Sequence, residues 1–548
     1  MRKYLSIIIL SAIYACTPMK KQEVDLLLVN GNIYQVDSLF SKAEAFAVKD
    51  GKFVAVGSNS DIMAAYSAVT IYDAGGKAVY PGFIDGHCHF YGFGENLYRY
   101  ADLSGAQSFD EVITRLKTHA SSHPSEWILG RGWDQNQWPG QQFPDNEQLE
   151  SVFPGKKILL IRIDGHASLA SRAALKAAGI DSKTRIDGGE IHLGADGEPT
   201  GILIDKADEG VKSLVPSLSV AEKKIALKEA QARCFAVGLT SVTDAGLPVA
   251  TIELIREMQE SNQLQMRVNA MIDPDENTLT YYLARGAEKT NLLSIRSVKL
   301  YADGALGSRG AKMKAPYSDA PGKTGLLMYD TGFYRNVMKR AHEAGFQVNT
   351  HAIGDAGVEL VLKLYGEYLK GPNDKRWRIE HAQVVDPQDF ELFGKYNIIP
   401  SIQSTHATSD MNWADERLGP ERIKGAYAQK QLLETNGWLV NGTDFPIEHI
   451  NPIYTFYAAV FRVDMNGQPE GGFQMENALT REEALRSISI WAAKGAFEED
   501  LKGSIEPGKL ADFVVTNRDL MSATRELILE TKPLVVYSSG MKVFQNEF

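Results

Sequence analysis

Eight short β-rich runs alternate with helical patterns through the middle of this sequence, and that alternation limits its fold more than any other feature. Helical patterns such as Ala221–Val237 and Tyr334–Ala344 separate most of the runs. The predicted strands are Gly82–Asp85, Leu239–Asp244, Met266–Ile272, Ser297–Ala302, Gln347–His351, Trp377–His381, Ile398–Gln403 and Trp438–Asp444. Eight parallel strands with intervening helices predict an α/β fold, a (β/α)8 TIM-like barrel over residues 81–496.

The spacing of the predicted strands is uneven. The connection between the first and the second strand is much longer than the dozen or so residues that a crossover requires. We therefore expect a large insertion after barrel strand 1, at about residues 96–218, with a structure of its own.

Both ends of the chain are rich in β-forming residues. Near the start, Val24–Val36 and Ala45–Val56 contain the hairpin signals Asn30-Gly31 and Lys49-Asp50-Gly51. Near the end, Ala511–Thr516 and Pro533–Phe544 are strand-like. The simplest prediction is a small β-sandwich formed from both chain ends, residues 24–80 plus 497–548.

The first sixteen residues have the pattern of an export signal. Arg2 and Lys3 precede an apolar run, Leu5–Ala15, which is too short to span a bilayer. Ile13-Tyr14-Ala15-Cys16 resembles a bacterial lipobox, in which the cysteine is lipidated. We expect an exported protein that is lipid-anchored through Cys16 to a bacterial membrane and faces the periplasm or the exterior; a plain signal peptide is the alternative.

Charge and cysteine content exclude several other classes of protein. The 58 basic and 69 acidic residues give a net charge of −11, and no long basic run is present, so a nucleic-acid partner is not expected. Three cysteines are too few for a disulfide framework. The expected partner is a small-molecule substrate, and a homodimer is the default assembly.

Polar residues stand where the predicted strands end. They are His87, His89, Asp244, Lys299, Asp303, His351, His381 and Asp444. Because a (β/α)8 barrel has its active site at the carboxyl ends of its strands, we expect these side chains to converge.

His87 and His89 flank Cys88 directly after an apolar run. Residues i and i+2 of an extended chain face the same side, so both imidazoles can reach one metal ion. His351 and His381 end the fifth and sixth predicted strands, and Asp444 ends the eighth, beside the first. Imidazole suits Zn²⁺, with manganese and iron as alternatives.

Lys299 lies inside the predicted strand SVKLYADG, where a buried ammonium group would be costly. A neutral buried amine can react with CO₂ to give a carbamate, which is an anionic oxygen ligand. The alternative is an ordinary ion pair with a nearby carboxylate such as Asp303.

The motifs around these residues resemble the binuclear amidohydrolase superfamily. PGFIDGHCHF, KLYADGALGSRGA, HAIGDAG, IEHAQ, NGTDFPIEHINP and GSIEPGKLADFVV are similar to its amidohydrolase-3 (YtcJ-like) branch, which includes N-substituted formamide deformylases. The resemblance covers about Val24–Phe548 and includes GRGWDQNQW and RIDGHASLASRAAL in the insertion. Two departures, at Ser404 and Thr443, affect no proposed ligand.

The resemblance implies a metal-dependent hydrolase with one or two divalent ions. His87 and His89 would hold one ion, His351 and His381 a second, and carboxylated Lys299 would bridge them. Asp444 would be both a ligand and the catalytic base that passes a proton to the leaving nitrogen. The implied reaction is hydrolysis of a non-peptide amide-like C–N bond, in an N-acyl or N-formyl amine or a cyclic amide, by a metal-activated hydroxide.

Substrate contacts are expected from other segments. His166, Asp134 and Trp133 come from the insertion, Arg309 follows the fourth strand, and His406 follows the seventh. For each of them, and above all for Trp133, a structural role is the alternative.

Two other functions remain open at this stage. One is a metal-dependent lactone or ester hydrolase using the same pocket, because a fold does not determine which bond is cleaved. The other is a non-catalytic surface lipoprotein that binds a small ligand.

Overall fold

Eight parallel strands form the centre of the molecule in this computed structural model, which describes residues 21–546 apart from 136–137, 164, 166 and 187–188. Their order is β8-β15-β16-β18-β19-β20-β21-β22. The strands are β8 (Phe83–Cys88), β15 (Leu239–Leu247), β16 (Arg267–Ile272), β18 (Leu293–Tyr301), β19 (Gln347–Ala352), β20 (Arg378–His381), β21 (Ile399–Ile402) and β22 (Val440–Asn441). The eight runs predicted from the sequence are these eight strands, and the predicted barrel is confirmed.

The barrel closes through backbone contacts between its first and last strands. The Asp444 N–H donates to the His87 carbonyl at 2.8 Å, just beyond β22. Close approach is possible because Gly86 and Gly442 stand at the seam: a Cβ atom on Gly442 would lie 2.5 Å from the His87 backbone nitrogen.

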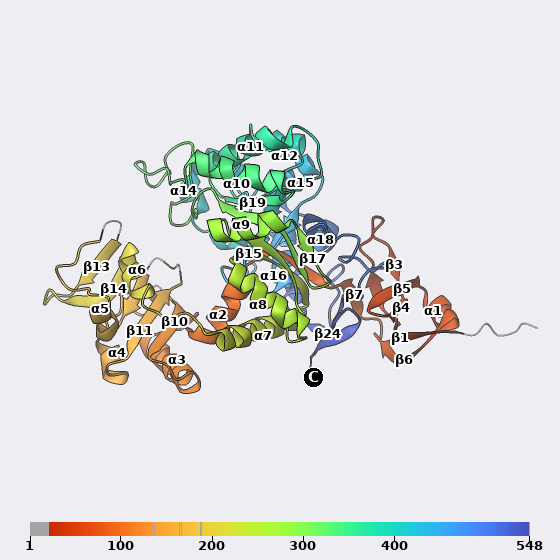
Figure 1. Cartoon of the computed structure of the whole chain (residues 1–548), viewed down its shortest axis with the longest axis horizontal. Coiled ribbons are helices and arrows are strands. Elements are labelled where there is room, and N and C mark those ends of the chain that lie inside the picture. The colour runs from red at the N-terminus through yellow and green to blue at the C-terminus, as the bar shows by residue number, and fades with distance from the viewer. Residues whose placement is uncertain (1–20, 136–137, 164, 166, 187–188, 547–548) are drawn as a thin grey trace, which may run out of the picture.

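Helices cover the outside of the barrel (Figure 1). They are α7 (Val220–Ala236), α8 (Val249–Glu260), α9 (Glu276–Arg285), α10 (Thr331–Glu343), α11 (Asp355–Leu369), α12 (Phe390–Tyr396), α15 (Gln429–Asn436), α16 (Pro452–Phe461), α17 (Arg481–Ser487) and α18 (Ile490–Gly495). Local sequence fixes where several begin: Ser219 and Glu222 form a capping box at α7, and the Asp330 side chain caps α10.

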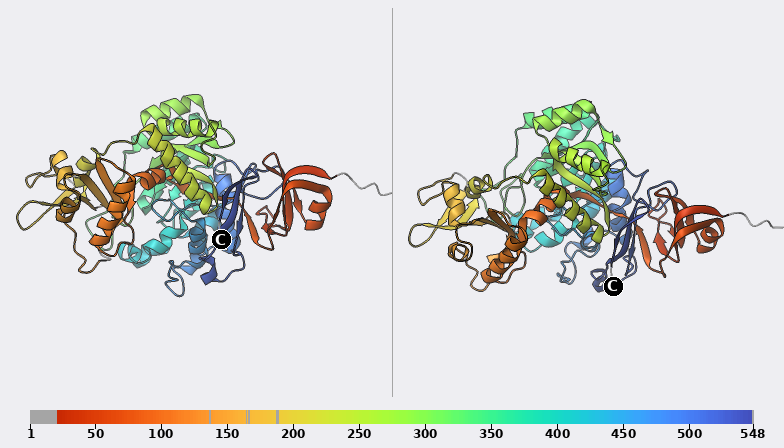
Figure 2. Two further views of the ribbon diagram at one scale, coloured as in Figure 1. Left: turned by 90° about the horizontal axis from the view of Figure 1, so that it is seen from below. Right: turned by 60° about the horizontal axis from the view of Figure 1, so that its bottom comes forward.

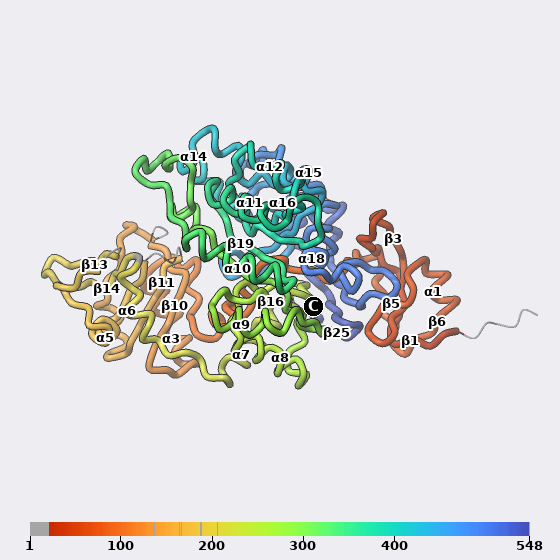
Figure 3. The backbone as a smooth tube through the Cα atoms, turned by 45° about the horizontal axis from the view of Figure 1, so that its top comes forward, coloured from red at the N-terminus to blue at the C-terminus, as the bar shows by residue number. Residues whose placement is uncertain are grey.

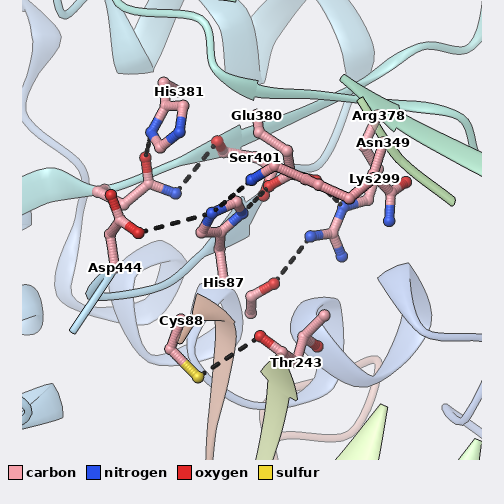
Figure 4. A network of polar contacts seen from close by, with 12 residues as sticks. His87, Cys88, Thr243, Lys299, Asn349, Arg378, Glu380, His381, Ser401 and Asp444 are labelled. Carbon is pink, nitrogen blue, oxygen red and sulfur yellow. Dashed lines mark hydrogen bonds and ion pairs between the residues drawn. The ribbon is translucent and has the colours of Figure 1, made fainter. Parts of the chain in front are cut away.

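Alternation along each strand separates apolar from polar side chains. In β18, Val298 and Leu300 belong to the main hydrophobic core, whereas Lys299 between them points into the barrel (Figure 4). In β20, Ile379 joins the core, and Arg378 and Glu380 point inward. The interior of the barrel is therefore polar and nearly closed to solvent.

Strands from both chain ends form two packed sheets, as expected. One has the order β5-β4-β1-β6 and the other β25-β24-β23-β7-β2-β3. Their bounds are β1 (Gln22–Val29), β2 (Asn32–Tyr34), β3 (Lys42–Ala43), β4 (Ala45–Lys49), β5 (Lys52–Gly57), β6 (Tyr66–Asp73), β7 (Ala78–Pro81), β23 (Phe513–Thr516), β24 (Pro533–Ser538) and β25 (Met541–Gln545), with α1 (Asn59–Ala65) and α19 (Arg525–Ile528) alongside. Phe46, Phe53 and Phe513 pack edge-on or tilted between the sheets.

One of the two predicted hairpins is wrong. The Lys49-Asp50-Gly51 turn does join the antiparallel pair β4 and β5. Asn30-Gly31, however, carries the chain from β1 in one sheet to β2 in the other. Asn30 has a φ of 55°, which suits a tight turn whether it joins two paired strands or two sheets. The sequence therefore predicted the turn correctly, but not the pairing of the strands on either side of it.

The insertion after the first barrel strand has its own sheet, of order β13-β14-β12-β11-β10-β9. Its elements are β9 (Tyr100–Asp102), α3 (Phe109–Ser122), β10 (Trp127–Trp133), α4 (Glu147–Val152), β11 (Lys157–Arg162), β12 (Ala167–Ala170), α5 (Arg172–Ala177), β13 (Gly189–Leu193), β14 (Pro199–Asp205) and α6 (Glu209–Lys212). In β11, Ile158 and Leu160 face one hydrophobic cluster and Leu159 and Ile161 another. The sheet is therefore covered on both faces.

The insertion and the N-terminal sheet lie on opposite sides of the barrel, which all views show (Figures 1, 2 and 3). Among the described residues, no helix has the length and apolar character needed to cross a bilayer. The predicted signal segment and Cys16 lie outside the described residues.

Candidate metal centre

Polar side chains from several barrel strands meet at the carboxyl end of the barrel, and Figure 4 labels four of them, His87, Lys299, His381 and Asp444. The group consists of His87, Lys299, His351, His381 and Asp444, with His89 at its edge. Ligand atoms of His87, His381 and Asp444 all lie within 4.8 Å of one another, close enough to share one metal ion. We call these six residues the metal cluster.

Asp444 is the carboxylate at the middle of the metal cluster. Its Oδ1 lies 3.2 Å from His89 Nε2 and 3.6 Å from His87 Nε2. The two histidines expected to share an ion therefore face one carboxylate oxygen. Their ring centroids are 5.9 Å apart.

The two histidine pairs that the resemblance implied lie side by side in the structure. The ring of His381 lies 5.0 Å from that of His87 and 4.6 Å from that of His351. His381 thus stands between the two expected pairs, and the metal cluster is a single compact group.

Two of these side chains reach the metal cluster through left-handed backbone. His381 has a φ of 73° and Asp444 a φ of 60°, a region that residues other than glycine rarely occupy. In β20 the alternation places Arg378 and Glu380 inward, so His381 would otherwise face the helices. The unusual φ turns its imidazole toward the interior, and such conformations are typical of functional sites.

Histidine nitrogens in this group are left without protein hydrogen bonds. His351 Nε2 is buried with no hydrogen-bond partner among the described residues, and Asp303 Oδ1 lies 3.6 Å from it. His406, on α13 (Ser404–Asp410), is buried, and neither of its ring nitrogens has a hydrogen-bond partner in the described chain. Its Nε2 lies 3.8 Å from Asp444 Oδ2. Unpaired buried nitrogens are costly unless a ligand occupies them.

Burial keeps the imidazoles neutral. It lowers the pKa of His87 to about 4 and that of His351 to about 3, assisted in both by the charge of Lys299. Burial also holds the pKa of His381 well below its ordinary value. For Asp444 burial acts in the opposite direction, but the neighbouring histidines His89, His87 and His381 outweigh it and hold the pKa well below the usual range. At neutral pH, His87, His351 and His381 are therefore neutral imidazoles and Asp444 is an ionised carboxylate, the forms that bind metal ions.

Lys299 is fully enclosed in the barrel. Burial lowers its pKa to about 8, and its Nζ lies 3.2 Å from His87 Nε2. The carboxylates whose charge acts most strongly on Lys299 are those of Glu380 and Asp444. The Asp303 carboxylate accepts hydrogen bonds from the backbone N–H groups of Ile353, Gly354 and Lys312. Asp244 is likewise structural, since its carboxylate accepts the Tyr91 N–H at the start of α2 (Phe90–Arg99).

Three residues behind the metal cluster were not predicted from the sequence. Glu380 Oε2 lies 2.5 Å from His87 Nδ1, Arg378 Nε donates to Glu380 Oε1 at 2.6 Å, and Gln403 Oε1 lies 2.6 Å from His381 Nδ1. Glu380 and Arg378 stand two residues apart in the run RWRIEH. Charged residues at alternate positions of a predicted buried strand were the signal that could have identified them.

Two of the predicted substrate contacts from the insertion, Trp133 and Asp134, make their contacts within the insertion itself. Trp133 is a correction: it lies in the core of the insertion, 1% exposed, and its indole N–H donates to the Leu160 carbonyl at 2.8 Å. A side chain packed in this way has no free surface for a substrate. Asp134 pairs with Arg162 at 2.6 Å, and His166 lies outside the described residues.

Arg309 also differs from its expected role as an anchor for the substrate. Its guanidinium makes two hydrogen bonds to Asp319, at 3.1 and 2.6 Å, and Arg417 pairs with the same carboxylate. The charge of Arg309 is therefore compensated within its own loop. Of the four predicted substrate contacts that lie among the described residues, the structure brings His406 to the metal cluster.

Comparison with known proteins gives relatives that span nearly the whole chain. It is 34% identical to the protein LONG AFTER FAR-RED 3 of Arabidopsis thaliana (92% of this chain, 89% of that one). It is 30% identical to the putative amidohydrolase YtcJ of Bacillus subtilis (94% and 98%) and 26% identical to the N-substituted formamide deformylase of Arthrobacter pascens (94% and 98%).

A solved structure agrees with this result. An uncharacterized metal-dependent hydrolase from Pyrococcus horikoshii superimposes with a TM-score of 0.77 at 27% identity, over 91% of this chain and 99% of that one. Residues 70–544 match the model of the amidohydrolase family, Amidohydro_3. The chain therefore belongs to the amidohydrolase family, in its YtcJ-like branch.

Proposed function

We propose that this protein hydrolyses a non-peptide C–N bond in a small N-acyl or N-formyl amine or a cyclic amide. The observation that carries the proposal is the metal cluster itself: neutral imidazoles, an ionised carboxylate and a buried lysine at the carboxyl end of a barrel. The formamide deformylase among the relatives supports the choice of bond. A lactone or ester hydrolase is the second candidate, because the same groups would act on a C–O bond.

The donor set fits a divalent ion. Nitrogen and oxygen ligands of this kind suit Zn²⁺, and His351 Nε2 is a buried nitrogen with no hydrogen-bond partner in the described chain. We propose that His87, His89 and Asp444 would hold a first ion, that His351 and His381 would hold a second, and that carboxylated Lys299 would contribute to both positions. Such an ion polarises a carbonyl group and lowers the pKa of water toward 7.

The residues of the chain would then orient the substrate and move protons. Asp444 Oδ1, held by His89, accepts a proton from the attacking water and passes it to the leaving nitrogen. His406 Nε2, 3.8 Å from Asp444 Oδ2, is placed to donate a hydrogen bond to the carbonyl oxygen of the substrate. The nearly closed barrel interior excludes other water molecules from the lysine and the imidazoles.

We also propose that Lys299 carries a carbamate. Its amine nitrogen would attack the carbon of CO₂ and lose a proton, leaving an anionic carboxylate on Nζ. Burial favours the neutral amine that this step needs, as the lowered pKa of about 8 indicates.

Elemental analysis combined with a substrate screen tests the function. Purified protein is expected to contain divalent metal, to lose hydrolysis of N-formyl and N-acyl amines on chelation, and to recover it with Zn²⁺. A metal-loaded protein that cleaves esters and lactones but none of these amides would favour the second candidate. A protein that binds no metal would refute the mechanism.

Export and lipid anchoring at Cys16 form a separate proposal, which rests on the sequence alone. In a bacterial host, Cys16→Ser is expected to release the protein from the membrane fraction and to abolish incorporation of labelled fatty acid. Unchanged fractionation of this variant would favour a plain signal peptide.

A further inference from the structure

Glu380 links the metal cluster to a buried guanidinium, that of Arg378, two residues before it in β20. Its side chain is fully buried, with Oε2 2.5 Å from His87 Nδ1 and Oε1 accepting from Arg378 Nε at 2.6 Å (Figure 4). One carboxylate therefore joins an imidazole of β8 to a guanidinium of β20. These two strands are not neighbours in the barrel, so the contact crosses its interior.

Arg378 fixes the other end of this link. Its side chain is fully buried, and Nη2 donates to the Gly86 carbonyl at 2.8 Å, one residue before His87. The guanidinium thus holds both the backbone of β8 and the carboxylate that contacts the His87 ring. A guanidinium paired with a carboxylate keeps that carboxylate ionised, and an ionised carboxylate can only accept hydrogen bonds.

The tautomer of His87 follows from this pairing. Because Glu380 only accepts, Nδ1 of His87 must carry the proton and donate it. Nε2 then has a free lone pair, and it faces Lys299 Nζ at 3.2 Å and Asp444 Oδ1 at 3.6 Å. His381 is held in a similar way, since its Nδ1 lies 2.6 Å from the Gln403 amide oxygen, but that acceptor is neutral.

We propose that Glu380, oriented by Arg378, is a positioning residue that holds His87 as the Nδ1–H tautomer and directs its Nε2 lone pair at the metal. The proposal rests on the metal centre proposed above. Outer hydrogen-bond partners of this kind raise the basicity of a histidine ligand, and their loss costs tenfold to a hundredfold in metal affinity.

Glu380→Gln tests the tautomer directly. Arg378 Nε still needs an acceptor, so the new amide turns its oxygen to Arg378 and its NH₂ group to His87. Nδ1 must then accept, and the proton moves to Nε2, which can no longer bind metal. We expect the dissociation constant for Zn²⁺, measured by competition with a chromophoric chelator, to rise tenfold to a hundredfold. In the ¹⁵N spectrum of the metal-free, histidine-labelled protein, His87 should change from the Nδ1–H to the Nε2–H tautomer.

A matched pair of double variants covers the case in which an uncompensated Arg378 prevents folding. Arg378→Met with Glu380→Gln leaves an amide that is free to offer its oxygen to His87. Arg378→Met with Glu380→Leu has a similar volume and no acceptor. We expect the double variant that carries Glu380→Gln to bind Zn²⁺ at least tenfold more tightly than the double variant that carries Glu380→Leu. A purely structural role for Glu380 would not produce this difference.

The outcomes separate this inference from the proposed function. Zn²⁺ affinities within twofold of the parent, with His87 still the Nδ1–H tautomer, would overturn the role of Glu380 while leaving the metal centre intact. A parent protein that binds no Zn²⁺ would refute the proposed function. The ¹⁵N tautomer of the metal-free protein would then still decide whether Glu380 sets the proton position.

Discussion

Asp444 is the residue on which the charges of the metal cluster depend. Its carboxylate contacts His89 and His87, and a left-handed backbone holds it at the end of the barrel. An asparagine would keep the shape of the side chain and remove both the anionic ligand and the proton acceptor. We expect Asp444→Asn to lower kcat for any substrate found by about 10²–10⁴-fold, the range of general acid–base catalysis.

The control for this variant is Asp319→Asn. Asp319 pairs with Arg309 and Arg417 and with no residue of the metal cluster, so removing its charge should leave kcat and KM unchanged. Full turnover by Asp444→Asn would disprove the assignment of the base. A large rise in KM for Asp319→Asn would instead restore Arg309 as a substrate anchor.

Lys299 gives the centre a dependence on pH that the histidines cannot give. Its pKa of about 8 means that the amine loses its proton as the pH rises through 8, and only the neutral amine forms a carbamate. His87 and His351, with pKa values of about 4 and 3, are already neutral well below that pH. In bicarbonate buffer, metal uptake by the metal-free protein should therefore increase between about pH 7 and 9.

Equilibrium dialysis of Lys299→Ala against Zn²⁺ is the comparison for this prediction. Without the lysine, the amount of Zn²⁺ bound should not change between about pH 7 and 9 and should not respond to bicarbonate. If the parent is also flat, or if removing CO₂ changes nothing, Lys299 is not carboxylated. The residue would then act in the metal centre as a buried amine.

Sequence alone identified the ligand candidates better than the residues that orient them. His87, His351, His381 and Asp444 could be found because each ends or closely follows a predicted strand, and strand ends converge in a barrel. Glu380 could not be assigned, because its contact with His87 depends on which strands face each other across the interior. Trp133 was misassigned because an aromatic residue in a loop-rich motif does not reveal which hydrophobic cluster it enters.

At the scale of elements, alternation accounts for how the sequence makes a polar interior inside an apolar shell. β18 and β20 each send apolar residues to the helices and charged residues inward. All eight strands were predictable for this reason, although β22 has only two residues in the ladder. The Asn30-Gly31 hairpin was not predictable, because a turn signal specifies local backbone geometry and the choice between two sheets depends on contacts far along the chain.

The closure of the barrel depends on the absence of side chains at its seam. A Cβ on Gly86 would lie 2.7 Å from the Asn441 carbonyl oxygen and would collide with Val440 as well. We expect Gly86→Ala to force β8 and β22 apart and to destabilise the barrel by about 1–3 kcal/mol, the usual cost of overpacking. Urea unfolding followed by tryptophan fluorescence measures this change.

Gly57→Ala is the matched control for the seam. Gly57 ends an edge strand, β5, and an added Cβ there would meet nothing within 4 Å. Its substitution should be neutral or stabilise by up to about 1 kcal/mol, because alanine restricts the unfolded chain. If Gly86→Ala and Gly57→Ala lowered the free energy of unfolding equally, the contact between β8 and β22 would be no tighter than an ordinary sheet edge.

At the scale of the whole molecule, the chain contains separate hydrophobic cores. The barrel has the largest, the sandwich has its own, and the insertion has one on each face of its sheet. The insertion lies on the far side of the barrel from the N-terminal sheet (Figure 2). Units with separate cores open with separate free energies, so a single unfolding transition is not expected.

Metal removal should therefore destabilise one part of the molecule and spare another. An ion bound only by the folded barrel stabilises it by about 2.7 kcal/mol when its concentration is a hundred times Kd. Calorimetry of metal-loaded and chelated protein should show the barrel transition moving to lower temperature while the transition of the insertion stays fixed, because no proposed ligand lies in its sheet. In the Asp444→Asn protein, chelation should lower the temperature of the barrel transition by less than it does in the parent protein. If both transitions moved together, the insertion and the barrel would unfold as one cooperative unit, and the insertion would contribute to the stability of the metal centre despite its separate core.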